Sequence, residues 1–373
     1  MKIGVLGAGQ LGRMLAQAGA RLGMQFRFLS PPGETCVQGL GELLQGDLLD
    51  DALLDRFAAD LDAVTIEWEN VPTAAIERLA RRVPVRPGVA SLQCGQDRIH
   101  EKQFFRECGL QVQAFAPVDA PRDFEAALQA VPLPAMLKTR RMGYDGKGQA
   151  KVLTRASLAD AFASLGSVPC ILEAFVPFDS EISIVAVRGL DASGREDMRL
   201  WSACRNEHRE GILDCTVAPA SGIPEAAIQR AQAGVRTVLS RLRHEGVLAV
   251  EFFLCNGELI ANEMAPRVHN SGHWTIEGAR TSQFENHLRA VARMPLGDTA
   301  ATGVSVMRNL IGVVPAPSAA LPASVHLHLY GKQPRARRKL GHLTSVAQQE
   351  SLAMSDADAA FAALHAQPAS ARG

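Results

Sequence analysis

Residues Val250 to Trp274 read V-E-F-F-L-C-N-G-E-L-I-A-N-E-M-A-P-R-V-H-N-S-G-H-W, and this stretch decides the fold. A mostly apolar run from Val247 to Leu254 is long enough for one strand. The dipeptide Asn256-Gly257 follows, and it favours a tight reversal because both residues tolerate positive φ. A second apolar run, Leu259-Ile260-Ala261, then returns along the first. The pattern predicts a β-hairpin.

Each arm of this hairpin carries one carboxylate, Glu251 on the first arm and Glu263 on the second. Two neighbouring carboxylates repel unless a cation lies between them, and hard oxygen ligands suit Mg²⁺, with Mn²⁺ as a substitute. A strict two-residue loop would set Glu251 opposite Asn262 and turn Glu263 to the other face. The metal hypothesis therefore requires a one-residue bulge or a three-residue loop, which Gly257 would supply.

Polar side chains crowd the segment just beyond the hairpin, where Arg267, His269, Asn270, Ser271 and His273 occur within seven positions. So many donors and acceptors make a poor core. A solvated loop is the plain alternative, but loops on rigid scaffolds are where binding and catalytic residues concentrate. We therefore expect a functional site here.

Composition bounds the class of protein. The 373 residues suffice for about two to three domains. Lys plus Arg equals Asp plus Glu at 39 each, so no bulk field would attract nucleic acid or an anionic membrane. Seven irregularly spaced cysteines without a C-x-x-C pair indicate reduced thiols. With no signal-peptide pattern and no run of membrane-spanning length, we expect a cytoplasmic protein.

The N-terminus predicts a Rossmann-like βα unit. A strand, Lys2 to Leu6, leads directly into Gly7-Ala-Gly9-Gln-Leu-Gly12, and apolar residues then recur at helical spacing. The N-terminus of such a helix can hold an anion, which makes a dinucleotide site one interpretation. However, the second strand, Gln25 to Leu29, ends in Ser30-Pro31-Pro32 without the acidic residue that would bind ribose hydroxyls. This argues against NAD.

Two further stretches leave a structural and a functional interpretation open. A strand from Ala63 to Glu67 ends in Glu67-Trp68-Glu69-Asn70-Val71-Pro72, whose polar residues either face a ligand crevice or cap a helix. Near the C-terminus, the run from Lys332 to His342 carries five cations in eight residues. It is either a solvated loop or a cluster that binds one substrate phosphate.

The middle of the chain offers candidate nucleotide contacts. A helix is predicted from Asp97 to Cys108, with Asp97 as its N-cap, and we expect a new domain to begin with it. A strand ending at Lys138 leads into Arg140-Arg-Met-Gly-Tyr-Asp-Gly-Lys-Gly148, whose backbone N–H groups and cations suit a polyphosphate, although a hairpin turn is an alternative. Glu173 and Glu181 lie on predicted strands whose edge and linker would suit adenine and ribose, although an exposed strand residue is the alternative for Glu173. His208 is expected in a connecting loop.

Taken together, these pieces resemble the ATP-grasp enzymes and, more narrowly, the N5-carboxyaminoimidazole ribonucleotide synthases of purine biosynthesis. The motifs run in order along nearly the whole chain. They are G-x-G-Q-L-G-R-M from Gly7, E-x-E-N-V-P from Glu67, D-R-x-x-x-K from Asp97, G-Y-D-G-K-G-Q from Gly143, A-P-R-V-H-N-S-G-H-W-T from Ala265 and K-L-G-H-L from Lys339.

The resemblance implies an α/β and α+β protein: an ATP-grasp fold with an N-terminal Rossmann-like domain and a small C-terminal β-rich domain. The implied domains span residues 1–96, 97–295 (with a mobile lid at about 115–178) and 296–373. It further implies Mg²⁺ at Glu251 and Glu263, and a homodimer. Bicarbonate would meet the catalytic residues Arg267, His269 and Lys332. Implied ATP contacts are Arg98, Lys138, Gly143, Tyr144, Asp145, Gly146, Lys147, Gly148, Glu173, Ala174, Phe175, Val176, Glu181, His208 and Asn262. Implied ribonucleotide contacts are Tyr144, Asp145, Asn270, Ser271, Lys332, Arg338 and Lys339.

The implied reaction is ATP- and bicarbonate-dependent carboxylation of the amine of 5-aminoimidazole ribonucleotide, through carboxyphosphate, with release of ADP and phosphate. One departure concerns the metal: Ala265 stands where the wider superfamily carries an Asn ligand. Two alternatives remain at this point. One is a sister ATP-grasp ligase with another acid substrate, and the other is a NAD-binding oxidoreductase or nucleotide-sensing module.

Overall fold

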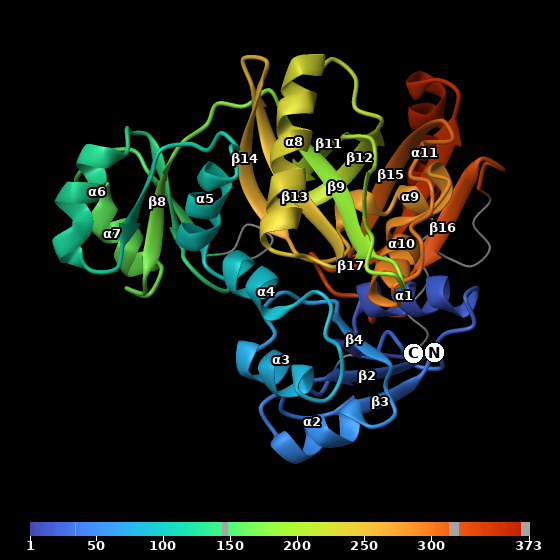
Figure 1. Ribbon diagram of the computed structural model, residues 1–373. Coiled ribbons are helices and arrows are strands. Elements are labelled where there is room, and N and C mark those ends of the chain that lie inside the picture. The colour runs from blue at the N-terminus through green and yellow to red at the C-terminus, as the bar shows by residue number, and fades with distance from the viewer. Residues whose placement is uncertain (34, 144–147, 313–320, 367–373) are drawn as a thin grey trace.

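The structure is a computed structural model that describes residues 1–33, 35–143, 148–312 and 321–366. Within these residues the strands form three sheets, and Figure 1 shows them as three adjoining bodies. The sheet of the first residues lies below the large sheet in that view, and a smaller sheet projects to the left. No helix in the described part of the chain has the length and apolar character needed to cross a bilayer.

The first sheet is parallel, with strand order β3-β2-β1-β4. Its central strands are almost entirely apolar because helices and neighbouring domains cover both faces. The strands are β1 (Lys2–Leu6), β2 (Gln25–Ser30), β3 (Glu42–Gln45) and β4 (Ala63–Ile66). The helices are α1 (Gln10–Ala20), α2 (Asp51–Ala58), α3 (Thr73–Ala80) and α4 (Val89–Gly95). The predicted Rossmann-like start of the chain is therefore present, with loops leaving the carboxyl ends of β1 and β4.

The small sheet is antiparallel, with order β5-β8-β6-β7, and it has its own apolar core. Helices α6 and α7 pack against it. Its elements are β5 (Phe115–Val118), η1 (Pro121–Asp123), α6 (Phe124–Ala130), β6 (Ala135–Thr139), β7 (Gln149–Val152), α7 (Ser157–Ser164) and β8 (Cys170–Ala174). The glycine-rich segment follows β6 and precedes β7 in the chain, and its residues 144–147 are outside the described residues.

The large sheet has nine strands in the order β14-β13-β9-β11-β12-β15-β17-β16, with β10 paired to β9. Its strands are β9 (Ser180–Leu190), β10 (Glu196–Leu200), β11 (Cys204–Arg209), β12 (Ile212–Ala218), β13 (Gly246–Cys255), β14 (Glu258–Ala265), β15 (Val304–Ile311), β16 (Val325–Leu329) and β17 (Lys339–Ala347). The associated helices are α5 (Arg98–Glu107), α8 (Glu225–Arg241), η2 (Asn270–Gly272), α9 (Thr275–Gly278), α10 (Gln283–Val291) and α11 (Glu350–Ala366). Strand β12 pairs with β15, so backbone hydrogen bonds cross the domain limit predicted at 295/296. The domain limits themselves remain a prediction.

One expectation about local structure was wrong: His208 was placed in a connecting loop, but it belongs to β11, which pairs with β9. The C-terminal part contains β15, β16 and β17, as expected of a β-rich domain, together with the long helix α11, which packs its alanine-rich side on β15 and β17. The predicted cap of α5 is confirmed, since the Asp97 carboxylate accepts the N–H of Ile99 at 3.1 Å.

The hairpin is confirmed, with its carboxylates face to face. Cys255 pairs with Glu258 across a strict two-residue turn, so Gly257 adds no extra loop residue. The register shifts at Asn262 instead, which lets Glu251 pair with Glu263. The required one-residue bulge therefore exists, but it lies within β14 and not at the turn.

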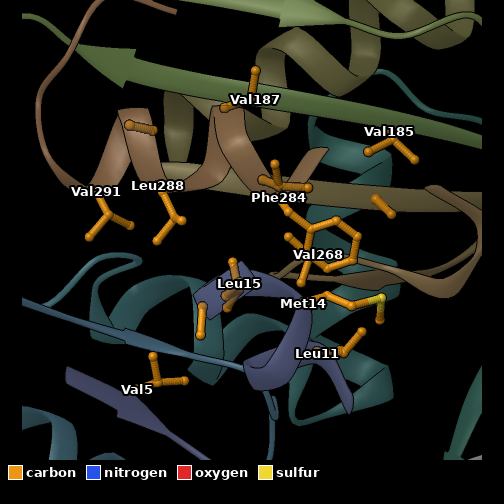
Figure 2. Close-up of a cluster of buried hydrophobic side chains, with 14 of the residues drawn as sticks. Val5, Leu11, Met14, Leu15, Val185, Val187, Val268, Phe284, Leu288 and Val291 are labelled. Atoms are coloured by element: carbon orange, nitrogen blue, oxygen red, sulfur yellow. The ribbon is translucent and has the colours of Figure 1, made fainter. Parts of the chain in front are cut away.

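A buried apolar contact fixes the N-terminal domain against the large sheet. In Figure 2, Leu11, Met14 and Leu15 of α1 face Phe284 and Leu288 of α10. Helix α10 in turn packs on β9 and β13. The glycine turn connects β1 to α1, and β1 pairs with β4. The packing of α1 on α10 therefore fixes the ends of both strands relative to the loop that follows the hairpin.

Candidate functional site

A cavity of about 580 Å³ lies where the first domain meets the hairpin. The strand ends of the N-terminal sheet supply one wall, and the hairpin with its following loop supplies the other. Eight of the predicted site residues line it: Arg98, Gly143, Glu251, Glu263, Arg267, His269, Asn270 and Lys339. Segments separated by more than 300 residues in the chain thus form a single site.

The carboxylates of Glu251 and Glu263 make this cavity suited to a cation. The Arg98 guanidinium binds Glu263 at 2.8 Å, and although burial acts in the opposite direction, Arg98 and Lys138 lower the pKa of Glu263. Burial, together with the charge of Glu263, raises the pKa of Glu251. One carboxylate is thus destabilised by its neighbour when no cation is bound.

These two carboxylates suit a hard divalent ion whose other ligands are not side chains of the protein. Among the described residues, no cluster of three or more His, Cys, Asp or Glu side chains could hold a metal. Mg²⁺ is commonly held by one or two carboxylates, with waters and substrate phosphates completing its octahedron. The side-chain oxygen of Asn262, at the bulge between them, is buried and has no hydrogen-bond partner among the residues that the structure describes.

The loop after the hairpin brings a cation and a neutral imidazole to the same wall. Arg267 forms an ion pair with Glu69, which belongs to the loop after β4. Nε2 of His269 lies 3.6 Å from Glu251, while its Nδ1 lies 2.8 Å from the Ser271 hydroxyl. Burial, reinforced by Arg267, lowers the pKa of His269 to about 3, so this imidazole is neutral near pH 7.

The glycine turn that suggested a dinucleotide site is filled by a side chain of the protein itself. The Glu67 carboxylate accepts the backbone N–H groups of Gly9 and Gly12 at the start of α1. A Cβ atom on Gly7 would lie 2.2 Å from Cγ of Glu67, so glycine is required there for this approach. The anion that the helix N-terminus attracts is therefore Glu67, which argues against a dinucleotide pyrophosphate at this position.

A second polar cluster joins the small sheet to the hairpin. The carboxylate of Glu173 on β8 accepts Lys138 at 2.7 Å and Gln113 at 3.1 Å, and Lys102 lies 3.5 Å away. The side chain of Glu173 is buried, so it does not reach solvent. Phe175, another of the implied ATP contacts, is exposed.

Glu181 and His208 come together on adjacent strands, although the sequence separates them by 27 positions. His208 forms an ion pair through Nδ1 with Glu181. Burial lowers the pKa of His208, but the hydrogen bond to Glu181 and the charges of Glu251 and Glu181 together outweigh burial and raise this pKa.

The remaining predicted residues lie behind or beside the cavity. Ser271 is buried and contacts His269. Lys332 binds the side chain of Gln10 in the N-terminal domain, and Arg338 lies 3.4 Å from the carbonyl of Gln333. Of the predicted lid residues, Tyr144, Asp145, Gly146 and Lys147 lie outside the described residues.

Several residues at the site were absent from the predicted set. They are Gln10, Glu67, Glu69, Glu101 and Lys102. The first three follow the carboxyl ends of β1 and β4, where ligand crevices form in parallel sheets, so their position was a usable signal. Lys102 is the lysine of the D-R-x-x-x-K motif, which was therefore a usable signal, whereas no periodicity rule would select the buried Glu101.

Three family models match the chain in succession. The Ribonucleotide synthetase preATP-grasp domain matches residues 1–96, the ATP-grasp domain residues 103–284, and the Phosphoribosylaminoimidazole carboxylase C-terminal domain residues 305–355. Together with the three sheets, these matches confirm the predicted fold class.

Similar proteins agree over almost the whole length. The N5-carboxyaminoimidazole ribonucleotide synthase of Pseudomonas aeruginosa is 51% identical over 345 residues, covering 92% of this chain and 94% of that protein. The crystal structure of the synthetase from Thermus thermophilus has 47% identity and a TM-score of 0.90, covering 100% and 99% of the two chains. A structure from Aspergillus clavatus, in complex with ADP and 5-aminoimidazole ribonucleotide, has 26% identity and a TM-score of 0.86, covering 98% of each chain. This chain therefore belongs to the N5-carboxyaminoimidazole ribonucleotide synthase family.

Proposed function

We infer that the protein is an ATP-dependent ligase that carboxylates the amine of 5-aminoimidazole ribonucleotide with bicarbonate, releasing ADP and phosphate. The observation that carries this inference is the facing pair Glu251 and Glu263 on the wall of a cavity shared with the N-terminal domain. The two carboxylates would hold the cation that accompanies a nucleotide. The part of the cavity next to the N-terminal domain would hold a second substrate. Family membership supports the same reaction.

We propose that the nucleotide lies between the small sheet and the hairpin. Lys138 and Glu173 form an ion pair on the small sheet, and Arg98 forms one with Glu263 of the hairpin. Glu181 lies on β9, which pairs with β13. Glu251 and Glu263 would hold Mg²⁺, which on binding neutralises charge on the transferring phosphoryl group. The predicted adenine contacts from Glu173 to Val176 would use backbone groups, since the Glu173 carboxylate is already engaged.

The first step activates bicarbonate. Bicarbonate is a poor electrophile because its leaving group would be hydroxide, and accepting the γ-phosphoryl group gives carboxyphosphate, which can lose phosphate instead. Arg267 and His269 lie beside Glu251, where the phosphoryl group would be transferred. Arg267 would orient the anionic bicarbonate, and the neutral imidazole of His269, whose Nδ1 accepts the Ser271 N–H, would donate a hydrogen bond from Nε2 without adding charge to the site.

The second step transfers the carboxyl group to the amine of the ribonucleotide. Lys332 and Lys339 lie on the C-terminal side of the site, and Arg338 is adjacent to Lys339. Their charges suit the single 5′-phosphate of this substrate. Carboxyphosphate is short-lived in water, so we propose that the glycine-rich loop from Gly143 to Gly148 closes over it.

We also propose the domain limits, the homodimer and the cytoplasmic location that were predicted from the sequence. The domain limits 1–96, 97–295 and 296–373 and the lid at about 115–178 rest on the sequence motifs. The homodimer rests on family resemblance, and light scattering of the purified protein tests it. A cytoplasmic location rests on composition, and fractionation of cells that express the tagged protein tests it.

A coupled assay tests the reaction. ADP release is measured with ATP and Mg²⁺, then with bicarbonate and 5-aminoimidazole ribonucleotide added singly and together, while carboxylated product is counted separately. We expect ADP and product in equal amounts only when both substrates are present. Equal ADP release with formate or an amino acid in place of bicarbonate would instead indicate a sister ligase.

A further inference from the structure

Lys102 is the most deeply buried cation among the described residues of the site, and the proposed reaction does not use it. Its side chain has 0% exposure. The ammonium group lies 3.2 Å from the side-chain oxygen of Gln113, 3.2 Å from the carbonyl of Ala261 and 3.5 Å from Glu173. The ammonium group thus has two hydrogen bonds and one ion pair, which together hold it in place.

The buried Glu173 carboxylate requires a cationic partner both before and after a nucleotide binds. Its side chain has 1% exposure, and an isolated buried carboxylate is costly unless it is paired. One oxygen accepts both Lys138 and Gln113, whereas the other faces Lys102. Burial raises the pKa of Glu173, but Lys102 and Lys138 outweigh burial and lower this pKa to about 2.

The two lysines differ in freedom to move. Lys138 has 12% exposure and precedes Gly143, the first residue of the glycine-rich loop, by five residues. The nucleotide phosphates are expected at this loop. It is therefore placed to exchange the Glu173 carboxylate for a phosphate. Lys102 is held on α5 and cannot follow, because Gln113 and Ala261 hold it on the other sides.

We propose that Lys102 is a positioning residue: it remains as the counterion of Glu173 and so releases Lys138 to bind the nucleotide phosphates. Without Lys102, the buried carboxylate would keep Lys138 for itself, and phosphate binding would have to break that ion pair. This inference rests on the proposed function, in that it takes phosphates to approach Lys138.

A rival role for Lys102 is purely structural. Ala261 precedes the bulge at Asn262, so the bond from Lys102 to the Ala261 carbonyl also supports the turn of Glu263 toward Glu251. The two roles differ in what rescues a defect. Removing the negative charge of Glu173 would rescue the counterion role, but it would do nothing for the bulge.

The test is a titration of the intact protein with ADP and Mg²⁺ and, separately, with adenosine. The variants are Lys102→Met, which keeps the length without the charge, Glu173→Gln, and the double variant. Lys151→Met, which removes an exposed lysine of β7, is the matched control. We expect Lys102→Met to bind ADP about tenfold more weakly than the parent, because one charge-assisted contact is withheld. Adenosine binding should change far less, since it involves no phosphate.

The double variant decides between the two roles. With the carboxylate neutralised, Lys138 is free again, and ADP should bind at least about threefold more tightly than to Lys102→Met alone. Parent-like ADP binding by Lys102→Met, equal weakening of ADP and adenosine, or a double variant no tighter than Lys102→Met would each overturn the inference. If Lys102→Met fails to fold, the double variant should fold; failure of both would also overturn it. A parent protein that binds no ADP would instead refute the proposed function.

Discussion

Two buried histidines at the junction of the first domain and the large sheet make stability depend on pH. Nδ1 of His287 accepts the backbone N–H of Val247 at 3.0 Å, so its Nε2 carries the proton and donates to the Thr65 hydroxyl at 2.7 Å. His244 lies 3.0 Å from both the Ser91 hydroxyl and the Val247 carbonyl. Protonating His287 would set two N–H groups against each other, in addition to burying a charge.

The size of the effect follows from the depressed pKa values. Burial, followed by the effect of His244, lowers the pKa of His287 from 6.5 to about 3, and burial lowers that of His244 to about 4. The unfolded chain therefore binds protons that the folded protein excludes. The stability contribution is fully present above about pH 6.5 and is lost as the pH falls toward these lower values. At about pH 5, roughly 1.5 units below the unfolded pKa, each histidine costs about 2 kcal/mol.

His287→Gln isolates one of these contributions. Glutamine can accept from Val247 and donate to Thr65, but it does not titrate, so the variant should lose about 2 kcal/mol less than the parent between about pH 7.5 and about pH 5. Denaturant unfolding at both pH values measures this difference. His100→Gln, which replaces an exposed histidine on α5, is the control and should follow the parent. Equal pH-dependent losses in the parent and His287→Gln would refute the reasoning.

Three further predictions concern the reaction. Glu251→Gln or Glu263→Gln should abolish ADP release, because each removes charge from the metal site. Each changes little volume, so the unfolding temperature should stay close to that of the parent. Near-normal turnover at limiting Mg²⁺ would exclude the metal assignment. Arg338→Ala should mainly raise KM for the ribonucleotide, by about 1.5–3 kcal/mol of lost binding, whereas Arg267→Ala should lower kcat at saturating ribonucleotide or uncouple ADP release from product. Full titrations that count both products would contradict this division if the two effects were exchanged. Cleavage near Lys147 in limited proteolysis should decrease when ATP and Mg²⁺ are added, since the glycine-rich loop is expected to become ordered over phosphates, and equal cleavage would count against a lid.

The sequence alone was sufficient for features that depend on neighbouring residues. The turn at Asn256-Gly257, the cap at Asp97 and the strand from Lys2 to Leu6 all follow from local patterns, and each is present. The sequence also showed that Glu251 and Glu263 could meet only if a bulge intervened. Local rules could not place that bulge, because the residues that flank Asn262 continue the strand pattern without a glycine; the tertiary bonds of Ala261 to Lys102 and Gln111 lie beside it.

Only the tertiary structure decided which charges meet. Glu67 enters the glycine turn from 55 to 58 positions away, Arg267 meets Glu69 across 198 positions, and Lys332 meets Gln10 across 322. No local pattern records such partners, because they depend on how α1 packs against α10 and brings two domains together. A buried charge is stable only beside its counterion, and the identity of that counterion is fixed when the chain folds, not by the residues that flank it.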